Sequence, residues 1–156
     1  MDTLAGRATR TIALALIALL VLGTFAVGNA QAAGPRQQYE KRLLNHTRRD
    51  YGRRSVHLHR RLNRIAREHS RKMARQDRLY HSENLVEKVR RMHWRRLGEN
   101  VGVAPQMGHR TLKEMHEAFM NSRSHRKNIL LRAFRRIGVG IVQRNGKVWV
   151  TVIFLG

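Results

Sequence analysis

The sequence has 156 residues, with 32 lysines and arginines against 10 aspartates and glutamates, a formal charge of +22 and no cysteine. The length predicts a single domain, and the absence of cysteine excludes disulfides, thiolate nucleophiles and cysteine metal ligands. The basic surface should attract polyanions, but charge alone does not choose among nucleic acid, anionic lipid and anionic polymers of the cell envelope.

Residues 1–32 have the pattern of a signal peptide. Arg7 and Arg10 precede an uncharged apolar run over residues 11–27, and Ala30 and Ala32 give the small-x-small pattern of a cleavage site. We predict cleavage after Ala32 and a secreted or extracytoplasmic protein. The alternative is an uncleaved N-terminal anchor, since a run of this length is at the short limit for crossing a bilayer. Cleavage removes two arginines and one aspartate, which lowers the formal charge from +22 to +21.

The first half of the mature chain is predicted to be helical. Residues 33–38 should form a flexible lead, and the domain should span residues 39–156. Apolar residues at helical spacing predict one helix from about Tyr39 that ends at Gly52, and a clearer amphipathic helix from about His59 to Gln76. Residues 79–84 break this period and predict a loop, followed by a weaker helix to about Arg91.

The next segment begins with a glycine-rich stretch. Residues 98–104 predict a turn that leads into a short strand. Thr111 and Glu114 have capping-box spacing, which predicts a helix that runs to about Ser122. Its buried stripe should consist of Leu112, Met115 and Phe119.

The C-terminal segment changes to the period of a strand. Two apolar runs, over residues 137–142 and 148–154, flank Asn145-Gly146, which is a strong signal for a hairpin. Gly138 and Gly140 lack the third glycine of a dinucleotide-binding motif, so we interpret them as sites of close packing. Both faces of the second run are apolar, which predicts a sheet covered by helices on both sides.

An ordered set of short motifs resembles the bacterial branch of the CAP superfamily, also called SCP-like domains, over roughly residues 40–154. Each motif is weak alone, and the set at these spacings is specific. The motifs are Leu44-Asn45 with Arg48 and Gly52, Ala66 with His69-Ser70 and Met73-Ala74, Leu79 with His81, Gly98-Glu99-Asn100-Val101, Phe119-Met120 with Ser122, His125-Arg126-Lys127-Asn128-Ile129-Leu130, and Phe134 with Ile137-Gly138-Val139-Gly140.

The resemblance implies an α+β fold, a three-layer α-β-α sandwich with a small antiparallel sheet, and a groove where histidines and acidic residues meet. His81 matches the first histidine of that groove and Glu99 the glutamate of the Gly-Glu-Asn motif. Ser122 stands where the eukaryotic branch has a second glutamate, and the eukaryotic motif with the second histidine is absent. His125, from the bacterial type of motif, is expected to line the same groove.

Two kinds of chemistry are open at these residues. His81 and His125 could hold a divalent metal such as zinc, with Glu99 as a third ligand or as a base. A carboxylate bonded to an imidazole is also a way to hold a loop in place. No serine lies in the context of a catalytic triad, so no catalytic residue is assigned. Asn100 and Asn128 are interpreted as structural ties between loops.

We therefore predict a secreted, monomeric binding protein that acts through the groove of His81, Glu99, Ser122 and His125. Its ligand is expected to be a lipid, an anionic envelope polymer or another extracellular molecule, and no specific nucleic acid is expected. One alternative is a metal-dependent or hydrolytic enzyme that uses the same groove. A further alternative is a cationic protein that binds anionic polymers or membranes through its charge.

Overall fold

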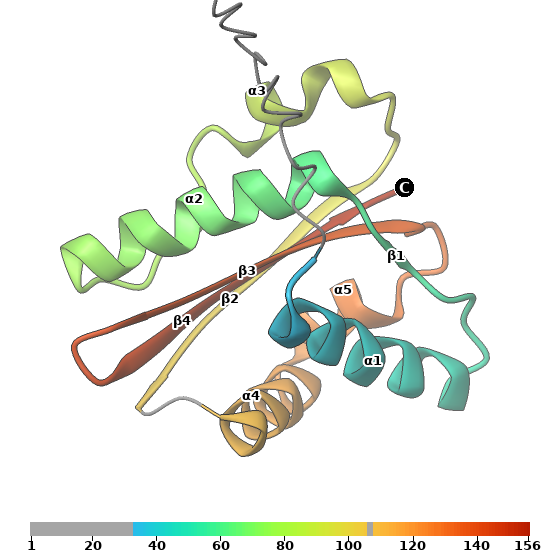
Figure 1. Cartoon of the computed structure of the whole chain (residues 1–156). Helices are drawn as coiled ribbons and strands as arrows, with labels where there is room; N and C mark the ends of the chain where they lie inside the picture. Colours follow the sequence, from blue (N-terminus) through green and yellow to red (C-terminus); the bar gives the residue numbers. More distant parts are fainter. Residues whose placement is uncertain (1–32, 106–107) are drawn as a thin grey trace, which may run out of the picture. The chain divides into compact units, whose positions relative to one another are not determined.

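The computed structural model describes residues 33–105 and 108–156, so the predicted signal peptide lies outside the described part of the chain. The chain contains five α-helices, one 3-10 turn and four strands within the described residues (Figure 1). They are α1 (Pro35–Asp50), β1 (His57–Leu58), α2 (Arg60–Gln76), α3 (Leu85–Val89), the 3-10 turn η1 (Arg90–Met92), β2 (Leu97–Pro105), α4 (His109–Asn121), α5 (Arg123–Leu130), β3 (Arg136–Arg144) and β4 (Lys147–Leu155).

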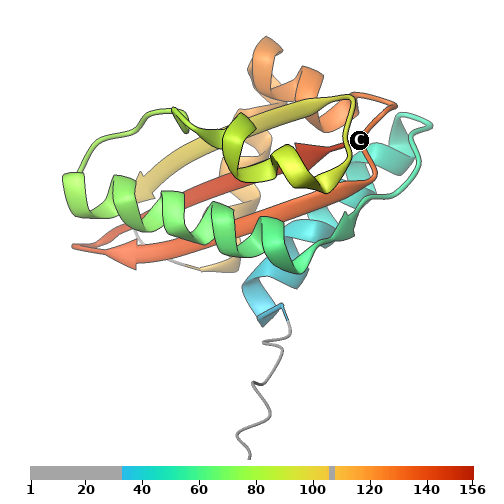
Figure 2. The same ribbon diagram turned by 90° about the horizontal axis from the view of Figure 1, so that it is seen from above.

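The sheet has the order β1-β3-β4-β2, and β4 lies in its interior. Strands β2, β4 and β3 are antiparallel along their whole length, and β1 adds a parallel pair of only two residues. α2 and α3 cover one face, and α1, α4 and α5 cover the other (Figures 1 and 2). The predicted α+β fold with three layers is confirmed, and β1 makes the otherwise antiparallel sheet a mixed one.

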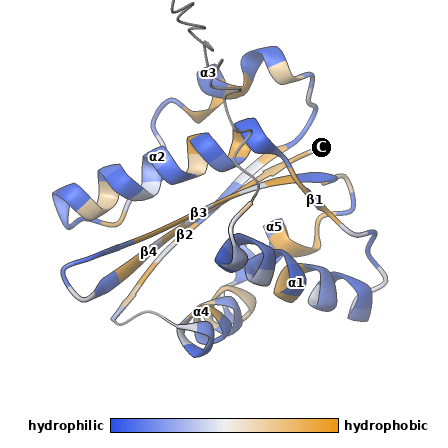
Figure 3. Cartoon of the chain, viewed as in Figure 1, coloured by the Kyte–Doolittle hydropathy of each residue, from blue (hydrophilic) through white to orange (hydrophobic). Residues whose placement is uncertain are grey.

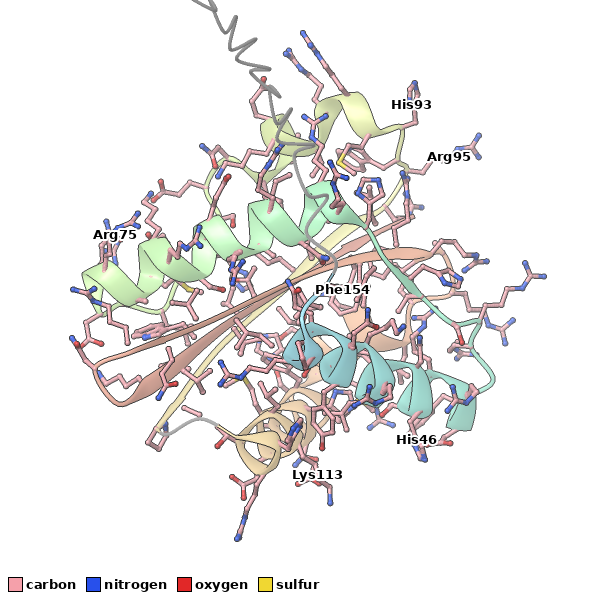
Figure 4. All side chains as sticks on the ribbon, viewed as in Figure 1. His46, Arg75, His93, Arg95, Lys113 and Phe154 are labelled. Atoms are coloured by element: carbon pink, nitrogen blue, oxygen red, sulfur yellow. The ribbon has the colours of Figure 1, made fainter. Side chains whose placement is uncertain are left out.

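The C-terminal hairpin forms as predicted. Asn145 and Gly146 have φ values of 49° and 68°, which a type I′ turn requires at both central positions. Along β4, side chains alternate between the two cores. Val148, Val150, Val152 and Phe154 face the core under α1 and α4, and Ile153 and Leu155 face the core under α2. Figure 4 shows Phe154 between the sheet and α1.

α2 lies very close to β3, because two glycines leave room for its backbone. A Cβ atom at Gly138 would overlap the backbone of Leu62, and one at Gly140 would overlap the backbone of Ala66. The prediction that these glycines serve close packing is confirmed. The apolar side of α2 faces the sheet and its hydrophilic side faces outward (Figure 3).

The start of α1 differs from the sequence prediction. The helix begins at Pro35, within the segment 33–38 that was predicted to be a flexible lead. Proline suits the first helical position because its missing N–H would have no helical partner there. The N–H of Gly34 donates to Oε1 of Gln37 at 2.8 Å, which closes the first turn. Periodicity of apolar residues missed this turn because its residues are polar.

Two further boundaries were wrong in the middle of the chain. β2 covers nine residues and is not a turn with a short strand, because it pairs with β4 along its whole length and cross-strand bonds outweigh the poor strand propensity of glycine. α4 begins at His109, so Thr111 lies inside the first turn and does not cap it. α5 was not predicted. The stripe of Leu112, Met115 and Phe119 is buried, as predicted.

A buried arginine connects α1 to the chain that follows α5. The Arg48 side chain is fully buried and donates hydrogen bonds to four backbone carbonyl oxygens, those of Arg54, Ile129, Leu131 and Phe134. These bonds hold the layer of α1, α4 and α5 in one arrangement.

Within residues 33–105 and 108–156, no helix is both long enough and apolar enough to cross a membrane.

Candidate functional site

Glu99 lies on β2, and its side chain is only 6% exposed. Its carboxylate accepts three hydrogen bonds from two consecutive residues of the loop that follows α2. The N–H of Ser82 donates to Oε2 at 2.9 Å, the Ser82 hydroxyl donates to Oε1 at 2.5 Å, and Nδ1 of His81 lies 2.9 Å from Oε2. Glu99 therefore fixes the loop against the edge of the sheet.

The bond to Glu99 also determines what His81 can do. Because Glu99 Oε2 can only accept, Nδ1 of His81 is the donor, and Nε2 is then left as an acceptor in the neutral ring. The His81 side chain is 62% exposed. His81 thus presents Nε2 to a ligand, with the ring orientation set by a buried carboxylate.

His125 and Ser122 lie across from this loop, at the junction of α4 and α5. Ser122 precedes the first residue of α5, and the ring of His125 packs edge-on against Phe119 with 5.0 Å between ring centroids. Burial lowers the pKa of His125, and the neighbouring imidazole of His81 lowers it further because two imidazolium charges would repel each other. His125 is therefore a neutral imidazole at pH 7.

Two asparagines hold this junction against β2. Nδ2 of Asn100 donates to the carbonyl oxygen of His125 at 3.2 Å. Nδ2 of Asn128 donates to the carbonyl oxygen of Glu99 at 3.1 Å and to Oδ1 of Asn100 at 2.9 Å. The prediction that both asparagines are structural is confirmed, but they tie β2 to α5 and do not join loops, because both lie within regular elements. The backbones of Glu99 and His125 are thereby held in a fixed relation.

An apolar groove runs beside these residues, between β2 and α4, and sequence reasoning did not identify it. Its polar lining residues are Thr111, Glu114, Ser122 and His125, and the others are small or apolar, among them Leu79, Val103, Ala104, Met115 and Phe119. Leu79 and Val103 are 45% and 37% exposed, which is unusual for large apolar side chains. A signal was present in the sequence: Thr111, Met115, Ala118 and Ser122 have the spacing of one helical face.

The structure therefore separates the four predicted site residues into two pairs. His81 and Glu99 are hydrogen-bonded to each other, and Ser122 and His125 line the apolar groove. Ser82 is a partner of Glu99 that the sequence analysis did not name, although it directly follows His81.

A metal site at these residues has few ligands. Among the residues that the structure describes, no three or more histidine, aspartate or glutamate side chains are grouped so that they could hold a metal ion. Glu99 already accepts three hydrogen bonds from the loop, and His81 and His125 are the two side chains here that offer a ring nitrogen as a ligand. Zinc sites in proteins usually have three or four protein ligands. The residues present do not fit such a site, and zinc binding stays a prediction.

Comparison with known proteins assigns nearly the whole described domain to one family. The model of the cysteine-rich secretory protein family (CAP) matches residues 41–154. The uncharacterized protein YkwD of Bacillus subtilis is 46% identical over 59 residues, which are 38% of this chain and 21% of that protein, so the match spans about a fifth of the length of the curated relative.

Solved structures show the same fold at low sequence identity. An outer surface protein of Borrelia burgdorferi is 14% identical with a TM-score of 0.64, over 77% of this chain and 90% of that one. An extracellular protein of Bacillus anthracis that contains an SCP domain is 19% identical with a TM-score of 0.61, over 80% of this chain and 44% of that one. Both likenesses establish the three-layer fold.

Proposed function

The chain belongs to the cysteine-rich secretory protein (CAP) family, and from that premise we propose that it is an exported binding protein whose groove between β2 and α4 holds an apolar ligand such as a lipid. Export is supported by the signal-peptide pattern of residues 1–32 and by relatives that are described as outer-surface or extracellular proteins. The single observation that carries the ligand class is the exposed apolar lining of the groove.

The groove suits a molecule with an apolar chain and a polar end. Leu79, Val103 and Met115 offer apolar contacts, and burying one such side chain against a ligand contributes about 1.5 kcal/mol or more. At one end, Ser122 offers a hydroxyl and His125 a neutral imidazole, which can donate or accept a hydrogen bond to a headgroup. Ser122 and His125 thus orient a ligand in this proposal, and His125 acts by hydrogen bonding alone.

A fluorescent long-chain fatty acid tests the proposal. Leu79→Gln and Val103→Gln should each weaken binding about tenfold, because each removes an apolar contact of the groove. Val86→Gln is the matched control, since Val86 is 62% exposed but lies on α3 outside the groove. It should change the dissociation constant less than about twofold. Equal affinity of all four proteins would contradict the proposal.

The alternative function, a metal-dependent or hydrolytic enzyme, is favoured by one observation, the free Nε2 of His81 oriented by Glu99. Calorimetric titration with zinc at neutral pH distinguishes the two functions. Micromolar binding by the wild type that His81→Ala abolishes would support the metal site. The double variant His81→Ala/His125→Ala should then lose any hydrolytic activity and stay folded. With no zinc binding, the bond between His81 and Glu99 has a structural role, and His125 belongs to the wall of the apolar groove.

A further inference from the structure

α2 carries a row of arginines along its outer face. It covers the face of the sheet opposite to α4, which forms a wall of the apolar groove. Arg60, Arg64, Arg67 and Arg71 are all exposed and recur at spacings of four, three and four residues. At 3.6 residues per turn they fall within about 60° around the helix axis and extend over about 16 Å. The outer face of α2 is hydrophilic along this length (Figure 3).

This row is one wall of a groove whose other wall is the start of α1. Of the eight residues that line the groove, five are arginines and none is acidic. Gly34 and Gln37 belong to the α1 side, and Asn63 lies on α2 below the arginines. The apolar groove lies against β2, at the opposite edge of the sheet from β3. The two sites are therefore separate.

The floor of the arginine groove is fixed by the edge of the sheet. Beyond the short pairing with β1, the outer edge of β3 is open at Val139. Nε2 of Gln37 donates to the carbonyl oxygen of Val139 at 2.7 Å, and the N–H of Val139 donates to Oδ1 of Asn63 at 2.9 Å. The two amides bind the carbonyl oxygen and the N–H of the same strand residue, so α1 and α2 are both tied to one point on the edge of β3. The groove is thus a built feature and not a gap between mobile side chains.

The arginines of the row lack partners within the described residues. None of the four has a carboxylate within 4.0 Å, and Glu68, the one acidic residue of α2, forms no ion pair. Cations on α4 are arranged differently, since Arg110 pairs with Glu114 at 2.9 Å and Lys113 with Glu117 at 3.7 Å. Like charges one turn apart repel each other, so an anion from outside the chain would stabilise the row.

The shape of the row indicates which anion it takes. A small anion contacts one or two guanidinium groups and leaves the others without a partner. A membrane surface would favour apolar side chains beside the cations, but the large apolar side chains with high exposure, Tyr51, Leu79, Val86 and Val103, do not line this groove. A linear chain of regularly spaced phosphates fits a row about 16 Å long, and guanidinium groups bind phosphate oxygens in pairs.

We propose that the groove between α2 and the start of α1 binds a linear phosphodiester polymer of the cell envelope through Arg60, Arg64, Arg67 and Arg71. The polymer lies along α2, with successive phosphates against successive arginines. This site would hold the protein at the envelope and leave the apolar groove free for its own ligand.

A labelled synthetic poly(glycerol phosphate) chain of about 12 units tests the proposal by fluorescence anisotropy, with protein expressed from its full coding sequence. Arg64→Gln/Arg67→Gln should weaken binding at least tenfold and reduce the slope of log affinity against log salt by about 2. The matched control is Arg91→Gln/Arg95→Gln, which removes the same charge from exposed arginines outside the groove (Arg95 is labelled in Figure 4). The control should weaken binding less than about threefold.

Several outcomes would overturn the proposal. An equal loss of affinity in both double variants would mean that the overall charge binds the polymer. Groove-dependent binding to vesicles that contain an anionic lipid, or to a single-stranded DNA of matched phosphate number, without binding to poly(glycerol phosphate), would assign the row to those partners instead. Arg71→Gln alone provides a milder second test, with an expected loss of about threefold. Fatty-acid binding should be unchanged in all arginine variants, so failure of this site and failure of the apolar groove are distinguishable.

Discussion

The two faces of the sheet are covered in different ways. On one face, α2 lies directly on Gly138 and Gly140, and its charged residues point outward. On the other face, Glu40 and His116 are buried between α1 and α4, and Arg48 is buried between α1 and the chain around the end of α5. On the first face the backbones of α2 and β3 are in contact, and the buried Ser70 hydroxyl also donates to the carbonyl oxygen of Gly140. The second face differs because it buries a guanidinium group and a carboxyl group. The first arrangement leaves a row of arginines free for a ligand, while the second makes the stability of the protein sensitive to charge.

Removing the guanidinium group of Arg48 should destabilise the packing of the helices on the second face of the sheet. Arg48→Met keeps much of the side-chain volume but leaves four backbone carbonyl oxygens, those of Arg54, Ile129, Leu131 and Phe134, without their donor. We expect the free energy of unfolding to fall by about 4 kcal/mol. Denaturation with urea measures this loss. A loss below about 1 kcal/mol would show that water replaces the guanidinium group and that the face does not depend on it.

Adding a single methyl group between α2 and β3 should destabilise the packing on the first face of the sheet. In Gly140→Ala, the new Cβ overlaps the backbone of Ala66 and Arg67, so α2 must move away from β3. We expect a loss of about 3 kcal/mol in the free energy of unfolding. Gly108→Ala is the control, because a Cβ there meets no atom within 4 Å and its φ of 177° suits any residue. Equal stability of the two variants would contradict the account of close backbone packing.

Glu40, a buried acid between α1 and α4, should make the free energy of unfolding depend on pH. Burial raises the pKa of Glu40 from 4.5 to about 8, and burial lowers the pKa of His116. Oε1 of Glu40 lies 3.9 Å from Nδ1 of His116, and neither atom has a hydrogen-bond partner within the described residues. The native protein therefore keeps one proton on Glu40 up to about pH 8, and His116 stays neutral.

The unfolded chain has lost both protons above the ordinary histidine pKa of 6.5. From there to about pH 8 the native state holds one proton more, so the free energy of unfolding falls as pH rises, by about 1.4 kcal/mol per pH unit. Between pH 4.5 and 6.5 both states hold one proton on this pair, and it adds no slope. Glu40→Gln should remove the fall above pH 6.5, which urea denaturation at several pH values measures. A parallel decline in both proteins would exclude Glu40 as its cause.

The sequence predicted most of the fold because much of the information is local. The hairpin follows from Asn145-Gly146, whose backbone must adopt positive φ, and α2 follows from its apolar spacing over four turns. The start of α1 and the length of β2 could not be read in this way. The first depends on a polar turn closed by Gln37, and the second on pairing with β4, which lies more than 40 residues further along the chain.

The candidate site was predictable to the extent that it rests on motif residues. His81 and Glu99 were identified together from the resemblance to the CAP family, and the structure joins them by a hydrogen bond. The apolar groove could not be found from motifs, since its lining comes from β2, α4 and the loop after α2. Nor does the sequence show that the arginines of α2 lack acidic partners, because any carboxylate on a neighbouring element could have paired with them.

By itself, then, the sequence determined the family, most of the elements apart from β1 and α5, and the pair of His81 and Glu99, since each of these depends on residue type at short or fixed spacing. Only the tertiary structure decided which side chains meet across elements. Two rows with the same helical spacing illustrate this difference. Met115 and Ala118 line an apolar groove because β2 lies beside α4, whereas Arg64 and Arg67 line a cationic groove because α1 begins beside α2. Which element lies beside a helix is set by long-range packing, and helical periodicity alone does not contain it.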